Sequence, residues 1–254
     1  MDLKDKVVIV TGGGTGLGKA ISLAMADEGA NIAVGYSRSE DDALATVKEI
    51  KAAGANAVAV KADVRDQKAV DAMVASVMDE FGRIDVLVNN AGISVLIPFE
   101  DLDGVKDDDW DRVMATNVKG PFYCIRAVMP IMKKQGAGRI VNIGTSSAIR
   151  PEGSSIPYVA SKAALHHMSV CLARAFAPNV TVNVVAAGTM PTRWWSLLTG
   201  EADTEERRQH AREENPLKRF AEPEDVAAAV VMVAKNDSMS GEVIPVDAGF
   251  CLRT

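Results

Sequence analysis

The sequence predicts an α/β fold, a doubly wound parallel sheet with helices on both faces. Short apolar runs of the kind found in buried parallel strands alternate with helical patterns over most of the 254 residues. The first run, Val7–Val10, leads into a glycine-rich turn at 11–18 and then into a helix. Strand, glycine turn and helix in this order present backbone N–H groups and a helix N-terminus to a phosphate. The order therefore predicts a phosphate site, although the glycine spacing differs from the commoner GxGxxG pattern.

The other elements are expected in chain order. Further strands are predicted at 31–36, 57–60, 84–88, 139–143, 181–185 and 242–246. Helices are predicted after the glycine turn, at 41–53, at 69–81, from 107 to about 132, through Tyr158 to about 176, and from 223 onward. Asp66 is the expected N-cap of the clearest helix, 69–81, and Asp107 to Asp109 are the expected cap of the next. No repeat or linker divides the chain, so we expect one domain over 1–254.

Composition narrows the class of protein. Apolar residues make up 48% of the chain, its net charge is −6 and its pI is near 5.2, which argues against a nucleic-acid surface. No apolar run approaches the roughly 18 residues of a membrane-spanning helix. The three cysteines, Cys124, Cys171 and Cys251, have neither paired nor metal-ligand spacing. We therefore expect a cytoplasmic protein without a metal site and without nucleic-acid or membrane partners.

Tyr158 and Lys162 form the pair with the clearest chemistry. Residues four apart share one face of a helix. An ammonium group within about 4–6 Å lowers the pKa of a phenol by roughly 1–3 units, toward the range in which general acids work best. The alternative is a buried ring beside a solvated amine. His166 and His167 follow by one turn, and we expect them to be polar or partner-facing positions rather than catalytic ones.

Together these residues resemble the short-chain dehydrogenase/reductase family, and the resemblance covers essentially the whole chain. The matching pieces occur in the family's order: 11–18, Asp63 with Val64, 89–92, Asn117, the hydroxyl cluster 145–147, Tyr158 with Lys162, and 246–249. The resemblance implies a Rossmann fold that transfers a hydride between a nicotinamide and a carbonyl or secondary alcohol. Three positions depart from the family pattern: Thr145 replaces a serine, Ala187 a proline and Ala248 a glycine.

The resemblance implies a catalytic set of Asn117, Thr145, Tyr158 and Lys162. Tyr158 would protonate the carbonyl oxygen while the Thr145 hydroxyl orients it. Lys162 would lower the pKa of Tyr158 and bond the nicotinamide ribose. Asn117 would hold a water that links Lys162 to solvent, and a local bond back to its own helix is the alternative. In the family the assisting hydroxyl commonly precedes the tyrosine by thirteen residues, which selects Thr145, with Ser146 as runner-up.

The resemblance also implies a cofactor-binding set. The glycines of the first turn approach the pyrophosphate, Asp63 and Val64 contact the adenine, and Thr192 holds the carboxamide. The full set is Gly12, Thr15, Gly16, Leu17, Gly18, Ser37, Arg38, Asp63, Val64, Asn90, Ala91, Gly92, Tyr158, Lys162 and Thr192. After the second strand, NAD-selective relatives carry an acid that binds the ribose diol. Here Tyr36, Ser37 and Arg38 stand there, so we expect NADP(H) to be preferred over NAD(H); the alternative is that Arg38 only caps a solvated loop.

Residues 190–216 interrupt the alternation of strands and helices. Four bulky apolar residues precede a highly charged helix pattern at Glu205–Glu214: Trp194, Trp195, Leu197 and Leu198. An exposed double tryptophan needs a reason, and the family folds this segment over the substrate. We therefore expect a small substrate cap; a surface helix pair packed on the sheet is the alternative.

The sequence leaves several substrates open. A 3-oxoacyl thioester, a sugar and a general ketone all fit a small-molecule carbonyl/alcohol reaction, and the apolar stretch 93–99 favours a substrate with an apolar portion. The alternatives are a non-catalytic dinucleotide-binding regulator on the same fold and a nucleotide-sugar epimerase of the extended family. Helical segments 122–132 and 163–176 are apolar on more than one side. Since the family assembles through these helices, we expect a homotetramer, with a dimer as second choice.

Overall fold

A seven-stranded parallel sheet forms the centre of the molecule. The computed structural model describes residues 1–190 and 205–253. Its strands lie in the order β3-β2-β1-β4-β5-β6-β7, and each pairs in parallel with its neighbours. Their bounds are β1 Val7–Val10, β2 Asn31–Tyr36, β3 Ala57–Lys61, β4 Val86–Asn89, β5 Gly138–Thr145, β6 Val180–Ala187 and β7 Val243–Val246. The predicted doubly wound sheet is confirmed.

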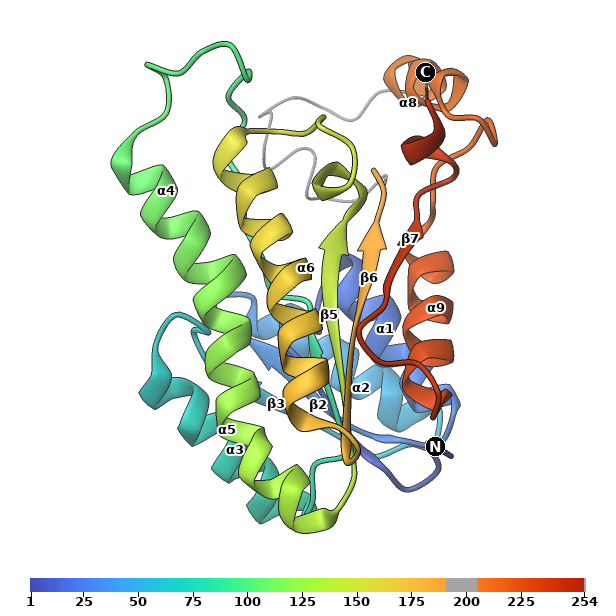
Figure 1. Cartoon of the computed structure of the whole chain (residues 1–254). Coiled ribbons are helices and arrows are strands. Elements are labelled where there is room, and N and C mark those ends of the chain that lie inside the picture. The colour runs from blue at the N-terminus through green and yellow to red at the C-terminus, as the bar shows by residue number, and fades with distance from the viewer. Residues whose placement is uncertain (191–204, 254) are drawn as a thin grey trace.

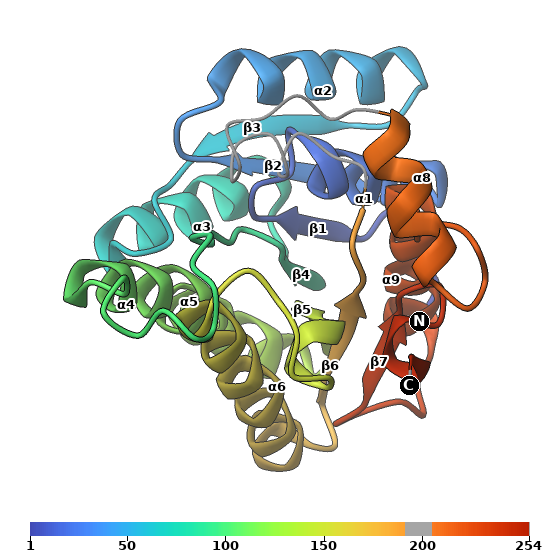
Figure 2. The ribbon, with the colours of Figure 1, turned by 90° about the horizontal axis from the view of Figure 1, so that it is seen from above.

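Helices cover both faces of this sheet (Figures 1 and 2). On one face lie α1 Gly16–Asp27, α2 Glu40–Ala52 and α9 Pro223–Lys235; on the other lie α3 Gln67–Phe81, α5 Gly120–Gln135 and α6 Ile156–Phe176. The helix α4 Asp107–Met114 precedes α5, and α8 Glu205–Glu214 lies at the same end of the molecule as the C-terminus. None of the described helices is long and apolar enough to cross a bilayer.

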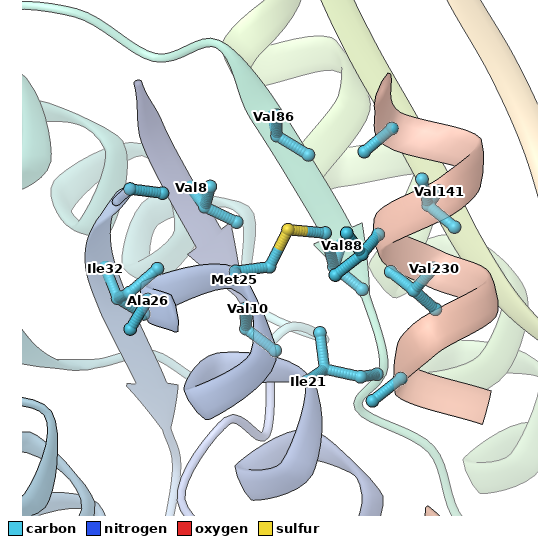
Figure 3. Packing of buried hydrophobic residues seen from close by; sticks show 14 of the residues in the cluster. Val8, Val10, Ile21, Met25, Ala26, Ile32, Val86, Val88, Val141 and Val230 are labelled. Atoms are coloured by element: carbon cyan, nitrogen blue, oxygen red, sulfur yellow. The ribbon is translucent and has the colours of Figure 1, made fainter. Parts of the chain in front are cut away.

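The apolar strands supply two cores, one on each face. Successive side chains of a strand point to opposite faces, so Val8 and Val10 enter one core and Val7 and Ile9 the other. In Figure 3, Met25 and Ile21 of α1 pack near Val88, and Val230 of α9 closes the same core. A fully buried side chain of this size contributes roughly 1.5–3 kcal/mol. Burial on both faces explains why the strands read as continuous apolar runs.

One local expectation, the N-cap of α4, was wrong. The N-cap of α4 is Lys106, whose backbone N–H donates to the Asp109 carboxylate at 3.2 Å, so the three aspartates lie in the first turn instead. A helix start can be capped from within that turn as well as from before it. The predicted helical segment from 107 to about 132 is present, and it changes its winding at Ala115–Lys119, a π-helical turn between α4 and α5. Turns of this kind are frequent at functional sites.

The predicted cap falls largely on residues that the structure does not describe. The tryptophans at 194 and 195 and the leucines at 197 and 198 lie within 191–204, outside the described residues, as does Thr192. The charged pattern that follows does form a helix, α8, as expected.

Asp66 caps α3 as the sequence predicted, because its carboxylate accepts a hydrogen bond from the Lys68 backbone N–H at 2.9 Å. We expect Asp66→Ala to lower the free energy of unfolding by about 1 kcal/mol, measured by urea denaturation. Asp79→Ala, an exposed change near the other end of the same helix, is the matched control. It removes a negative charge near a helix C-terminus and should be neutral or slightly stabilising. Equal losses in both variants would contradict the capping role.

Candidate active site

A cavity of about 470 Å³ lies at the carboxyl ends of β1, β4, β5 and β6. Ligands of open α/β sheets bind at this edge, where the strand order reverses. Here the reversal lies between β1 and β4. Most of the predicted cofactor and catalytic residues line it together: Gly12, Thr15, Gly16, Leu17, Gly18, Asn90, Ala91, Gly92, Thr145, Tyr158 and Lys162.

The glycine turn is shaped by close backbone approach. Gly12 and Gly16 have φ of 64° and 49°, a region that side chains disfavour. A Cβ at Gly18 would lie 2.0 Å from the Gly12 carbonyl oxygen, so only glycine fits there. The turn therefore leaves bare backbone at the N-terminus of α1. This cradle suits a pyrophosphate group.

Thr11 joins this turn to the loop after β4. Its hydroxyl oxygen accepts hydrogen bonds from the backbone N–H groups of Asn90 at 3.0 Å and Ala91 at 3.1 Å. The Asn90 amide donates in return to the carbonyls of Thr11 and Gly12. Two predicted parts of the cofactor site are thus held in register. Thr11 was not among the predicted site residues, although its place directly after β1 could have indicated the link.

Tyr158 lies at the start of α6 and faces Thr145 at the end of β5. Ser155 caps the helix by accepting from the Tyr158 backbone N–H at 3.3 Å. The Thr145 side chain hydrogen-bonds to the phenol. Burial raises the pKa of Tyr158, and the Thr145 hydrogen bond opposes that rise.

Lys162 is buried beside them at 5% exposure. Its Nζ donates to the Ile143 carbonyl at 2.8 Å and lies 6.0 Å from the centre of the Tyr158 ring. Burial lowers the pKa of the ammonium to about 8. Burial is the largest influence on the pKa of Tyr158, and the Lys162 ammonium donates to the Ile143 carbonyl. The lowering of the Tyr158 pKa by Lys162 stays a prediction.

Asn117 connects the π-helical turn to both neighbouring segments. Its Oδ1 accepts from the Ile93 N–H at 2.9 Å, and its Nδ2 donates to the Ile93 carbonyl at 2.9 Å and the Ser161 hydroxyl at 3.0 Å. The alternative of a local bond back to its own helix is therefore wrong. A Cβ added to Gly92 would lie 3.3 Å from Asn117 Oδ1 and 3.6 Å from Lys162 Nζ, which places the three residues together.

The adjacent serine, Ser146, is directed elsewhere. Its hydroxyl donates to the Asp247 carboxylate at 2.9 Å, and it is 1% exposed. Asp247 also accepts from the Gly249 and Cys251 backbone N–H groups, so Ser146 anchors the C-terminal turn. Of the three hydroxyl residues at 145–147, Thr145 and Ser147 line the cavity and Ser146 does not.

The predicted adenine contacts, Asp63 and Val64, follow β3, and the predicted cofactor residues Ser37 and Arg38 follow the neighbouring strand β2. The Asp63 carboxylate pairs with Arg65 at 2.6 Å, and hydrogen bonding to Arg65 is the main cause that lowers the pKa of Asp63. Arg38 lowers it further through its charge, so the two residues are close enough to interact. Ser37 and Arg38 are exposed, while Val64 is buried.

Some residues of the site were missed by sequence reasoning. His166, expected at a polar or partner-facing position, is buried at 8% exposure, and its Nε2 accepts from the Thr145 backbone N–H at 3.4 Å. Its spacing of four from Lys162 could have indicated a shared helix face. Glu152, Ser154 and Phe250 also line the cavity. They come from loops and the C-terminal turn, where no periodic pattern marks a position.

Comparison with known proteins identifies the family. Residues 6–201 match the family model for short chain dehydrogenases. The 3-oxoacyl-acyl-carrier-protein reductase FabG of Staphylococcus epidermidis is 37% identical over 250 residues, covering 96% of this chain and 98% of that protein. The 3-oxoacyl-acyl-carrier-protein reductase of Synechocystis is 36% identical over 257 residues, covering 98% of each.

A solved structure has the same fold. The dehydrogenase/reductase of Sinorhizobium meliloti superposes with a TM-score of 0.87 at 34% identity, over 98% of this chain and 96% of that one. With the glycine turn and the Tyr158–Lys162 pair meeting in one cavity, the matches establish that the chain belongs to the short-chain dehydrogenase/reductase family of NAD(P)-dependent oxidoreductases.

Proposed function

We propose that this oxidoreductase reduces the ketone of a 3-oxoacyl thioester with NADPH. The observation that carries the proposal is the meeting of Tyr158, Thr145 and Lys162 in the cavity that also contains the glycine turn. Relatives named as 3-oxoacyl-acyl-carrier-protein reductases, 36–37% identical over nearly the whole chain, support this substrate. Leu96, Met190 and Phe250 add apolar surface to the cavity, which suits a substrate with an apolar portion.

Tyr158 is the proton donor in this proposal. NADPH, when bound, supplies the hydride, and the protein supplies orientation and the proton. The Thr145 hydroxyl, already hydrogen-bonded to the phenol, orients the carbonyl oxygen beside it. As the proton leaves Tyr158, the positive charge of Lys162 favours the phenolate that remains. Asn117 holds the loop after β4 against α6, which keeps Lys162 in place.

A panel of 3-oxoacyl thioesters, sugars and simple ketones, followed by the absorbance of the nicotinamide, tests the substrate. We expect the highest kcat/KM for a 3-oxoacyl thioester. A clear preference for a sugar or a simple ketone would replace the proposed substrate, and tight dinucleotide binding without turnover of any carbonyl would favour a non-catalytic regulator.

We also propose that the protein forms a homotetramer. Light scattering at micromolar concentration measures the mass of the assembly, and a monomeric mass would exclude the proposal.

Removal of the phenolic hydroxyl tests the role of Tyr158. We expect Tyr158→Phe to lower kcat by about 10²-fold or more, the scale of a lost general acid, and to leave the Kd of NADPH nearly unchanged. Stopped-flow turnover and fluorescence titration of NADPH measure the two quantities. Turnover near the wild-type rate would remove Tyr158 from the mechanism.

The adjacent hydroxyls provide a matched pair of variants. Thr145→Ala should lower kcat/KM by about 10²-fold, as expected for one lost donor at a developing oxyanion, while Thr145→Ser should retain activity. Ser146→Ala should leave kcat/KM nearly unchanged and lower the free energy of unfolding by about 1–2 kcal/mol, because it loses a hydrogen bond to Asp247. The reverse order of activities would show that Ser146 is the assisting hydroxyl.

Arg38 is the proposed source of the preference for NADP. A guanidinium after β2 can pair with the 2′-phosphate, and the position of the usual acid is taken by Tyr36. Arg38→Ala should lower kcat/KM with NADPH by roughly 10-fold or more, the scale of a lost charge-assisted hydrogen bond, and change the value with NADH little. A wild-type preference for NADH, or equal losses with both cofactors, would contradict this role.

A further inference from the structure

The ring of His166 fills a space that the neighbouring strand leaves open. His166 lies on α6, one turn after Lys162, and is 8% exposed. Gly144 has no side chain there, and a Cβ added to it would lie 2.1 Å from His166 Nε2. The glycine on β5 and the imidazole on α6 therefore fit each other. The fit brings Nε2 to the last residue of β5, Thr145.

The hydrogen bond from the Thr145 backbone N–H indicates the protonation state of the His166 ring. A backbone N–H can only donate, so the Nε2 atom that receives it at 3.4 Å must carry a lone pair. A neutral imidazole with its proton on Nδ1 satisfies this geometry. Burial first, and the positive charge of Lys162 second, lower the pKa of His166 to about 4. On β5 and β6 it meets uncharged Gly144, Thr145 and Val184.

We propose that His166 is a positioning residue: its neutral imidazole holds the backbone amide of Thr145 and so directs the Thr145 hydroxyl toward the Tyr158 phenol. This inference rests on the proposed function, because it assigns His166 a role only if Thr145 assists proton transfer. A protonated ring could not accept this hydrogen bond and would add a second cation beside Lys162. In the folded protein the pKa of His166 lies below the usual value of about 6.5. The contribution of the neutral ring to folding stability is therefore fully present above pH 6.5 and is lost as the pH falls toward 4.

Three variants separate positioning from packing. The side-chain amide of glutamine can present an acceptor at the reach of Nε2, so we expect His166→Gln to keep kcat within about 3-fold of wild type. Leucine fills similar space without an acceptor, so His166→Leu should lower kcat by about 10-fold at unchanged KM for NADPH, through a small displacement of Thr145. His167→Leu, at the exposed adjacent position, is the control and should match wild type. Equal losses in the glutamine and leucine variants, or no loss in the leucine variant, would overturn the proposal.

A second measurement does not depend on turnover. Nitrogen-15 spectra of the three histidine side chains, with His166→Gln used for assignment, report which ring nitrogen carries the proton. We expect an unprotonated Nε2 and a protonated Nδ1 in His166 at pH 6. A protonated Nε2 would overturn the proposal even if the enzyme is active. If His166 gives the expected spectrum but the protein reduces no 3-oxoacyl thioester, the proposed substrate is wrong and the assignment of the His166 ring still holds.

Discussion

The burial of Lys162 is the constraint on which the rest of the site depends. An ammonium removed from water costs several kcal/mol unless other groups compensate for it. Here the Ile143 carbonyl accepts a hydrogen bond at 2.8 Å, and the pKa of the group falls to about 8. That carbonyl belongs to β5 two residues before Thr145, so the same strand end holds the lysine and presents the hydroxyl. Such a strongly perturbed cation inside a cavity is typical of functional sites.

The sheet places these groups because it is buried on both faces. Val7–Val10 contributes side chains to both cores, so β1 cannot slip by one residue without exchanging the two faces. The turn that follows β1 therefore starts at a defined height, and Thr11 ties it to the loop after β4. The packing of β1 in the two cores therefore determines where the bare backbone of the glycine turn lies. The geometry of the site depends on these cores.

The sequence predicted the features that depend on residues close together in the chain. Alternating strand and helix patterns indicated the parallel sheet, Asp66 was the expected cap, and the Tyr158–Lys162 spacing placed both side chains on one helix face. Three features of the site were not predicted, because they depend on contacts between residues distant in sequence. Ser146 bonds to Asp247 across 101 positions, Asn117 reaches Ile93 across 24, and His166 fits against Gly144 on another element. No periodic pattern encodes such pairs.

The most direct test follows the hydride in the wild-type protein and in a variant that lacks the proposed proton donor. NADPH that carries deuterium at both C4 positions of the nicotinamide would be mixed with a 3-oxoacyl thioester, and the product examined by mass spectrometry. The proposed mechanism predicts deuterium on the new carbinol carbon with the wild-type protein, and loss of that labelled product when the Tyr158 hydroxyl is removed although the cofactor still binds. Labelled product formed at equal rates by both proteins, or a wild-type protein that binds NADPH and transfers no deuterium, would contradict it.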